Sequence, residues 1–172
     1  MARRFYGTWR DADFFNWRYL AHPIFRYRPL ITAGSGGAVT GLAVWRVAEL
    51  HPSGIHLGRV VEFLPAEGFA EPLARALLGA LSEEGVSVVD FSTTTECFDR
   101  TLADCGFVAE RDFTERVPRL LDPPSYASSF VNIVAKNLRA SDPTGGFDSF
   151  ANWYATSADG DQDRPNRPLA LT

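Results

Sequence analysis

The sequence predicts a mixed α/β fold with a mostly antiparallel central sheet, a strand–helix–strand crossover and flanking helices. Two apolar runs, 25–34 and 38–50, flank the glycine-rich turn 34–37, an arrangement typical of a β-hairpin. A third apolar run, 55–64, is followed by an amphipathic helical pattern and then by a short β-branched run at 86–91. Because a strand, a helix and a strand in direct succession make a right-handed crossover, the sheet is expected to be mixed.

The segment before the hairpin predicts a short helix. The aromatic-rich run 13–20 follows Asp11 and Asp13, either of which can cap a helix by accepting hydrogen bonds from its first backbone N–H groups. Pro23 then ends the pattern. We expect a helix of about two turns that packs its aromatic side chains onto the sheet.

The crossover helix has the clearest helical signal in the chain. Leu73, Leu77 and Leu81 recur at positions i, i+4 and i+8, and Gly85 is the stop signal. A helix between two strands of one sheet packs its apolar side onto that sheet. The run 86–91 that follows is expected to be a buried strand.

Beyond the crossover, the sequence predicts a second helix and further strands. The helix lies within 94–107 and is closed by Gly106, and 107–120 then alternates as an outer strand. Periodicity does not decide between a strand and a short helix for 126–140. The segment 147–157 is a candidate last strand.

Composition bounds the class of protein. With 172 residues, of which 45% are hydrophobic and 13% aromatic, the chain can build one core, so we expect a single domain over 1–172. Within it, an aromatic helix occupies 1–25, the core 26–121, and C-terminal strands with a polar tail 122–172. The net charge of −4 gives no sign of a nucleic-acid-binding surface.

Targeting and metal-binding signals are missing from the sequence. The N-terminus lacks the apolar run of a signal peptide, and no stretch approaches the roughly 18 apolar residues of a membrane span, so a cytoplasmic location is expected. Cys97 and Cys105 have no second cysteine or histidine pair near them and are expected to be core thiols. No metal site is expected.

The order of these elements and one local motif carry a resemblance. Hairpin strands, a buried strand, a crossover helix, a further strand, a helix that ends in Gly-Phe and outer strands make the order of the GNAT acyltransferase fold. The motif "CFDRTLADCGFVAERDF" is similar to that family's helix exit, and the resemblance runs from about Arg26 to Val117. The segments "FFNWRYLAHPIFRY" and "DGDQDRPN" resemble a subgroup tied to bacterial surface polysaccharide loci, which implies a small-molecule amine or sugar as substrate.

The resemblance implies a coenzyme A site at the start of the crossover helix. In the family, the turn after the buried strand cradles the pyrophosphate of an acyl-coenzyme A, which makes Phe63, Leu64 and Gly68 the candidate cofactor-binding residues. The turn "LPAEGFAEP" departs from the family's Arg/Gln-x-x-Gly-x-Gly/Ala pattern. It has one glycine, and Glu67 and Glu71 bring negative charge to the place of the anion.

The resemblance also implies catalytic positions. Glu62, in "RVVEF", matches a position where some members hold a general base that deprotonates the acceptor amine. The family's acid is a tyrosine four residues before the glycine of Gly-Phe, and that position is Leu102, which has no proton to donate. The family's asparagine, seven residues before that tyrosine, falls on Thr95, which can still form hydrogen bonds.

Two functions remain open on these residues. The first is an acyltransferase that transfers an acyl group to an amino sugar or another amine, with Glu62 as base. The second is a catalytically silent GNAT-like lobe that binds a ligand or a partner domain. The family's first strand and helix need more residues than precede Arg26, which favours a partner lobe, either a second copy in a homodimer or a fused second lobe.

The acidic tail is the candidate substrate-binding segment. Asp159, Asp161 and Asp163 alternate, with Arg164 directly behind them. A standard calcium loop is excluded, because Arg164 replaces its glycine and Ala170 stands in the place of its bidentate glutamate. At a sheet edge, alternate carboxylates would bind hydroxyl or ammonium groups while Arg164 clamps a carboxylate. The alternative is a structural role, with Arg164 paired to one of the aspartates.

Overall fold

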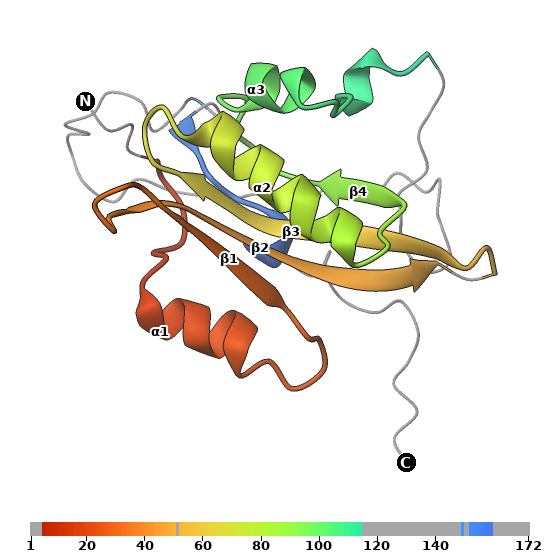
Figure 1. Ribbon diagram of the computed structural model, residues 1–172, viewed down its shortest axis with the longest axis horizontal. Coiled ribbons are helices and arrows are strands. Elements are labelled where there is room, and N and C mark those ends of the chain that lie inside the picture. The colour runs from red at the N-terminus through yellow and green to blue at the C-terminus, as the bar shows by residue number, and fades with distance from the viewer. Residues whose placement is uncertain (1–4, 51, 115–148, 150–151, 160–172) are drawn as a thin grey trace.

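The computed structural model describes residues 5–50, 52–114, 149 and 152–159. Its central feature is a four-stranded sheet in the order β1-β2-β3-β4 (Figure 1). The strands are β1 Arg28–Ala33, β2 Val39–Leu50, β3 Ile55–Pro65 and β4 Val88–Phe91. Neighbours among β1, β2 and β3 are antiparallel, whereas β4 pairs parallel with β3. The predicted mixed, mostly antiparallel sheet is confirmed.

One face of the sheet is covered by the crossover helix α2, Ala70–Glu83. Its buried side chains include the leucines at the predicted spacing, Leu73, Leu77 and Leu81. These leucines pack with strand side chains in one core cluster. Gly58 of β3 allows the close approach of the helix, because a Cβ atom there would lie 2.6 Å from Leu81 Cδ2. The helix ends before Gly85, whose positive φ of 70° suits a helix stop.

The opposite face is covered by the aromatic N-terminal segment. It forms α1, Ala12–Phe15, which continues as the wider π-type turns of η1, Asn16–Leu20. Asp11 caps the helix, since its Oδ1 accepts the Phe14 N–H at 2.9 Å. Tyr19 is buried there in a second core cluster. The helix predicted at this position is confirmed.

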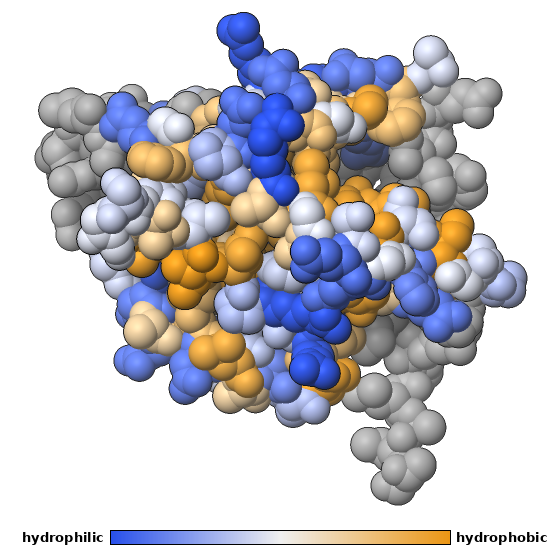
Figure 2. All heavy atoms as spheres, in the orientation of Figure 1, coloured by the Kyte–Doolittle hydropathy of each residue, from blue (hydrophilic) through white to orange (hydrophobic). Residues whose placement is uncertain are grey.

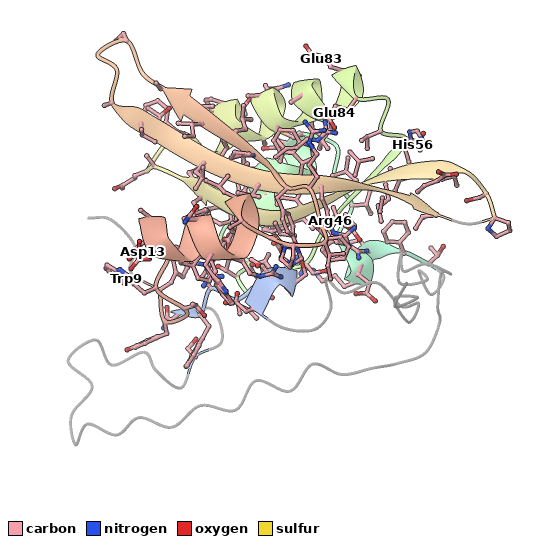
Figure 3. The ribbon with its side chains drawn as sticks, turned by 90° about the horizontal axis from the view of Figure 1, so that it is seen from below. Trp9, Asp13, Arg46, His56, Glu83 and Glu84 are labelled. Carbon is pink, nitrogen blue, oxygen red and sulfur yellow. The ribbon has the colours of Figure 1, made fainter. Side chains whose placement is uncertain are left out.

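The two helical layers lie on opposite sides of the sheet. Figure 1 shows α1 on one side and α2 on the other. The same separation is visible from below in Figure 3, where Glu83 lies with α2 and Asp13 with α1. The sheet therefore presents two distinct faces, each with its own core cluster.

The segments after α2 differ in part from the prediction. The second helix is confirmed as α3, Asp99–Asp104. β4 is not the buried strand that was expected, because it lies at one end of the strand order, with Val88 exposed and its other residues half-buried. The predicted outer strand is wrong over 107–114, which is irregular apart from the 3-10 turn η2, Glu110–Asp112. Its alternation serves no buried face, since Val108 and Phe113 are 59% and 47% exposed.

The described C-terminal segment, 152–159, lies between the N-terminal segment and the loop after β4. Tyr6 and Trp153 form a parallel bridge, and Thr93 and Thr156 form an antiparallel one. The predicted last strand is therefore present in its described part only as isolated bridges. The segment that periodicity left open between strand and helix lies outside the described residues.

Apolar and charged side chains are interspersed on the molecular face seen in Figure 2. The exposed large apolar side chains include Trp9 and Trp17 of the N-terminal segment. None of the helices in the described ranges is long and apolar enough to cross a membrane.

Candidate functional site

An irregularity in β3 places Glu62. The β2–β3 register pairs Val44 with Glu62 but Trp45 with Val60, so β3 carries one extra residue, Val61. In such a β-bulge two residues oppose one, and the alternation of side chains shifts by one position. Val61 and Val44 belong to the core cluster on the α1 side, whereas the residue after Glu62 belongs to the cluster under α2. The bulge thus directs Glu62 toward the α1 side of the sheet.

Glu62 is 0% exposed, and both of its carboxylate oxygens have donors. The Arg10 Nε and the Tyr19 hydroxyl donate to Oε1, at 3.1 and 2.6 Å. The Tyr154 hydroxyl donates to Oε2 at 3.0 Å. A buried carboxylate needs such partners because its desolvation is costly.

Asp159 joins this group from the far end of the chain. Its Oδ2 accepts the Arg10 Nη2 at 2.5 Å and the backbone N–H of Thr156 at 2.8 Å. Its Oδ1 accepts the Thr8 hydroxyl at 2.7 Å. Arg10 therefore lies between two carboxylates. We refer to the five connected residues as the Glu62 cluster: Arg10, Tyr19, Glu62, Tyr154 and Asp159.

Burial sets the direction of the pKa values in the Glu62 cluster. It raises the pKa of Glu62, against the opposing effects of the Arg10 charge and the two tyrosine hydroxyls. It also raises the pKa of Tyr19 and of Tyr154, and in both the nearby Glu62 charge adds to the effect. Burial alone would lower the pKa of Arg10, but the hydrogen bond to Asp159 and the two carboxylate charges outweigh it, so that pKa is raised. The cluster therefore favours a charged arginine and neutral phenols.

The three candidate cofactor-binding residues lie at the end of β3 and in the turn to α2. Phe63 is 1% exposed, and its N–H donates to the Tyr154 hydroxyl at 2.9 Å. Leu64 is half-buried and pairs with Leu42 of β2. Gly68 is exposed, with a φ of +81°. Of the three, Gly68 is the only one that is fully exposed.

The remaining motif positions are also located. Leu102 is buried in the core cluster with the α2 leucines. Thr95 is 2% exposed, and its hydroxyl accepts the Cys97 N–H at 3.3 Å. In the tail, Asp159 belongs to the Glu62 cluster, whereas the three other candidate substrate-binding residues lie outside the described residues: Asp161, Asp163 and Arg164.

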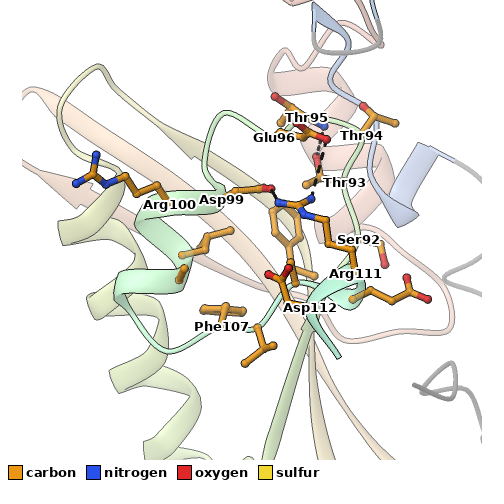
Figure 4. Close-up of a pocket in the computed structure, with 16 residues that line it drawn as sticks. Ser92, Thr93, Thr94, Thr95, Glu96, Asp99, Arg100, Phe107, Arg111 and Asp112 are labelled. Carbon is orange, nitrogen blue, oxygen red and sulfur yellow. Dashed lines mark hydrogen bonds and ion pairs between the residues drawn. The ribbon is translucent and has the colours of Figure 1, made fainter. Parts of the chain in front are cut away.

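A cavity of about 550 Å³ lies where the chain leaves β4 (Figure 4). Three segments line it: the loop 91–96, side chains of α3, and the segment 107–112 that contains η2. We refer to it as the β4 cavity. None of the residues of the Glu62 cluster lines it.

Charged groups of both signs line the β4 cavity. The Arg111 Nη2 lies 2.5 Å from Asp99 Oδ2, and its Nη1 lies 4.0 Å from Glu96 Oε1. The hydrogen bond and charge of Asp99 raise the pKa of Arg111, with further contributions from Asp112 and Glu96. Figure 4 shows these groups near one another, whereas the Arg100 side chain points away from them. Within the described ranges, no group of three or more His, Cys, Asp or Glu side chains is placed to hold a metal ion.

Sequence reasoning singled out Glu62 but missed three of its partners, Arg10, Tyr19 and Tyr154. They lie 52, 43 and 92 positions away along the chain, so no local pattern connects them to Glu62. The available signal was chemical, because a carboxylate within an apolar strand requires donors from elsewhere. The β4 cavity was missed as well, although three successive threonines after a strand mark a polar strand end.

The described elements follow one another in the order that the sequence resemblance implies. A hairpin, a third antiparallel strand, a crossover helix, a parallel strand and a helix before Gly106 succeed each other along the chain. This order agrees with the GNAT-like fold that the sequence resemblance implies. No family model matches the sequence, and no curated protein matches it.

The solved structures that are similar to this chain include several acetyltransferases, all at TM-scores below 0.5. Glucosamine-6-phosphate N-acetyltransferase from Arabidopsis thaliana has a TM-score of 0.43 and 8% identity, over 53% of this chain and 66% of that one. Ribosomal-protein-alanine N-acetyltransferase from Brucella melitensis biovar Abortus 2308 has a TM-score of 0.46 and 19% identity, over 63% and 80%. An aminoglycoside acetyltransferase from an uncultured soil metagenomic sample, in complex with trehalose, has a TM-score of 0.41 and 13% identity, over 77% and 78%. At these identities no activity or residue role transfers to this chain.

Proposed function

We propose that this chain is an acyltransferase-related, GNAT-like lobe that acts by binding and does not transfer an acyl group through Glu62. The observation that carries the proposal is the enclosure of Glu62, which is 0% exposed and has donors on both oxygens. A general base must come within hydrogen-bond reach of the proton that it removes, directly or through one water. Enclosed in this way, the carboxylate has no face to offer an acceptor amine.

Tyr154 also supports the proposal, because its hydroxyl is bonded to the backbone of Phe63, the residue after Glu62. Its hydroxyl accepts the Phe63 N–H at 2.9 Å and donates to Glu62. The residue itself is 4% exposed, so its ring fills the space beside β3 at this point. A cofactor that needed the Phe63 amide would have to displace a buried tyrosine whose hydroxyl also serves Glu62.

The turn before α2 fits the pyrophosphate of an acyl-coenzyme A poorly. Gly68 is its one glycine, and the first helical turn contains Glu71. The Glu71 carboxylate forms an exposed i,i+4 ion pair with Arg75 at 2.9 Å. The Arg75 guanidinium therefore already has a carboxylate as its partner. Carboxylates at a helix N-terminus repel an anion that would otherwise bind there. The residues of this turn therefore do not fit an acyl-coenzyme A.

N-acyl transfer to an amino sugar or another amine is the function with which this proposal competes. It needs a group that takes the proton from the amine, and Glu62 is the residue that the family resemblance assigns to that task. The two functions are therefore distinguished by whether any acyl transfer depends on Glu62.

The test combines a turnover assay with a binding assay. The chain is incubated with about 1 mM acetyl-coenzyme A and glucosamine, and release of the free thiol is followed, while a thermal shift reports cofactor binding. We expect no turnover above background and no shift of the melting temperature, in the wild-type chain and in Glu62→Gln alike. Turnover in the wild type that is lost in a folded Glu62→Gln variant would overturn the proposal.

A further inference from the structure

Two polar atoms on the α2 side of the sheet are buried without a hydrogen-bond partner. Within the part of the chain that the structure describes, neither the Trp45 Nε1 nor the Glu84 Oε2 forms a hydrogen bond, although both atoms are shielded from solvent. Trp45 is 4% exposed and belongs to the core cluster under α2. A buried donor or acceptor without a partner costs free energy, so each of these two atoms needs one.

Arg28 connects the two groups. It lies directly opposite Trp45 in the β1–β2 register, and directly opposite residues of an antiparallel pair leave the sheet on the same face. Leu30, two positions further along β1, packs against the core cluster under α2, which agrees with that face. The Arg28 Nη1 forms an ion pair with Glu84 Oε1. The unpaired donor and the unpaired acceptor therefore both lie beside one arginine.

The position of Glu84 makes it dependent on donors. It directly follows α2, and a carboxylate at that end of a helix faces the negative end of the helix dipole. Figure 3 shows Glu83 on the side of α2 away from the sheet, whereas Glu84 lies between the helix and the strands. The ion pair with Arg28 satisfies Glu84 Oε1, but Oε2 still needs a donor.

The two atoms are chemically complementary but do not bond to each other. An indole N–H is only a donor, and an ionised carboxylate oxygen is only an acceptor. One water molecule can accept a hydrogen bond from the first and donate one to the second. The Arg28 guanidinium carries five N–H groups and can supply a further bond. Buried waters typically make about three hydrogen bonds to polar groups that would otherwise be unpaired.

We infer that Trp45, Glu84 and Arg28 form a binding site for one buried water molecule. The water accepts a hydrogen bond from Trp45 Nε1 and donates one to Glu84 Oε2, with the Arg28 guanidinium beside it. It thereby links the end of α2 to the hairpin of β1 and β2. Glu62 is directed to the opposite face of the sheet, so the inference does not depend on the proposed function.

NMR of the full chain tests the site through the indole N–H protons. Cross-relaxation between water and each indole proton is measured in the laboratory frame and in the rotating frame. A water molecule held inside the protein gives cross-peaks of opposite sign in the two experiments, whereas chemical exchange with bulk water gives equal signs. We expect opposite signs for Trp45. Trp9 and Trp17 are internal references, because they are 80% and 69% exposed, and we expect no opposite-sign pair for them.

Two neighbouring glutamates provide matched variants. Glu84→Met keeps a side chain of similar length but removes the acceptor, and we expect the opposite-sign pair at Trp45 to be lost. Glu83→Met is the control, since Glu83 is exposed and points away from the sheet, and we expect it to keep the pair. The backbone amide spectrum of each variant shows whether it is folded.

Two outcomes overturn the inference. The first is the absence of an opposite-sign pair at the Trp45 indole proton in the wild-type chain, as a direct hydrogen bond from Trp45 to Glu84 in solution would produce. The second is a pair that persists unchanged in Glu84→Met, because the water would then not bridge to this carboxylate. Neither outcome alters the result expected for Glu62→Gln in the turnover assay.

Discussion

The polar groups of the Glu62 cluster lie inside the protein with their partners supplied, whereas those of the β4 cavity lie near the surface and outnumber their partners. In the cluster, the guanidinium of one arginine donates hydrogen bonds to the carboxylates of Glu62 and Asp159, and two tyrosine hydroxyls also donate to Glu62. In the cavity, Arg111 is engaged while Glu110 and Asp112 face solvent. The comparison shows that the buried polar groups of the cluster are paired with one another, whereas two carboxylates of the cavity are left to solvent.

The cluster gains its structural role from where its members come from. Arg10 belongs to the N-terminal segment, Tyr19 to η1, Glu62 to β3, and Tyr154 and Asp159 to the C-terminal segment. Three distant parts of the chain thus meet on one face of the sheet. Losing a member of such a group leaves the others buried and unpaired, which costs more than the removed contact itself.

The largest expected effect is that of Arg10→Met. The variant keeps an apolar stem but leaves Glu62 and Asp159 without their cation, and we expect the free energy of unfolding to fall by about 3–5 kcal/mol. Urea denaturation followed by circular dichroism measures it. Arg111→Met is the control, because Arg111 is 60% exposed and its removal is expected to leave stability unchanged. Equal losses in the two variants would contradict the contrast between the cluster and the cavity.

A smaller loss is expected for Tyr154→Phe. The change removes one oxygen and leaves the buried Phe63 N–H and the Glu62 Oε2 without this partner, at a cost of about 1–3 kcal/mol in the free energy of unfolding. Tyr27→Phe is the matched control, since the Tyr27 hydroxyl accepts a bond from Arg18, which also donates to the Ala158 carbonyl. The same denaturation experiment should show a smaller loss there. If Tyr154→Phe leaves the free energy of unfolding unchanged, a water molecule has replaced the hydroxyl as the hydrogen-bond partner.

The smallest expected effect is a change of stability with pH. Burial raises the folded-state pKa of Glu62 above its ordinary value of 4.5, so the folded protein holds that proton more tightly than the unfolded chain. The stability that this contributes is fully present below pH 4.5 and is lost as the pH rises through the folded-state pKa. Glu62→Gln cannot titrate, so the stability of the wild type relative to this variant should decline with rising pH. A relative stability that increases with pH would show that Arg10 and the hydroxyls outweigh burial.

Local patterns predicted the sheet and its crossover correctly. Leu73, Leu77 and Leu81 all lie on the buried side of α2, because their spacing matches the helical repeat. A capping aspartate before the aromatic run was also predicted, as either Asp11 or Asp13, and the structure shows that it is Asp11. The predicted outer strand is wrong over 107–114 because alternation alone does not make a strand, and Val108 and Phe113 remain exposed there.

The candidate site was predictable only in its central residue. Glu62 was singled out because it matches a position where some members of the family hold a general base, but nothing near it in sequence indicates the bulge that turns it toward α1. The cofactor-binding role given to Phe63 came from the resemblance, which places the coenzyme A site where this strand leads into the crossover helix, and the Tyr154 that bonds its amide lies 91 residues away. The β4 cavity likewise depends on how α3 and η2 return to the loop after β4.

The sequence by itself determined the type and order of the elements, because helical spacing, strand alternation and turn glycines act over a few neighbouring residues. Only the tertiary structure decided which polar groups are enclosed and which remain exposed to solvent. Enclosure depends on residues such as Arg10, Glu62 and Asp159 that meet from distant parts of the chain, and on a one-residue bulge that changes the face of a strand. For that reason the same sequence pattern around Glu62 was compatible with a catalytic base and with the centre of a structural cluster.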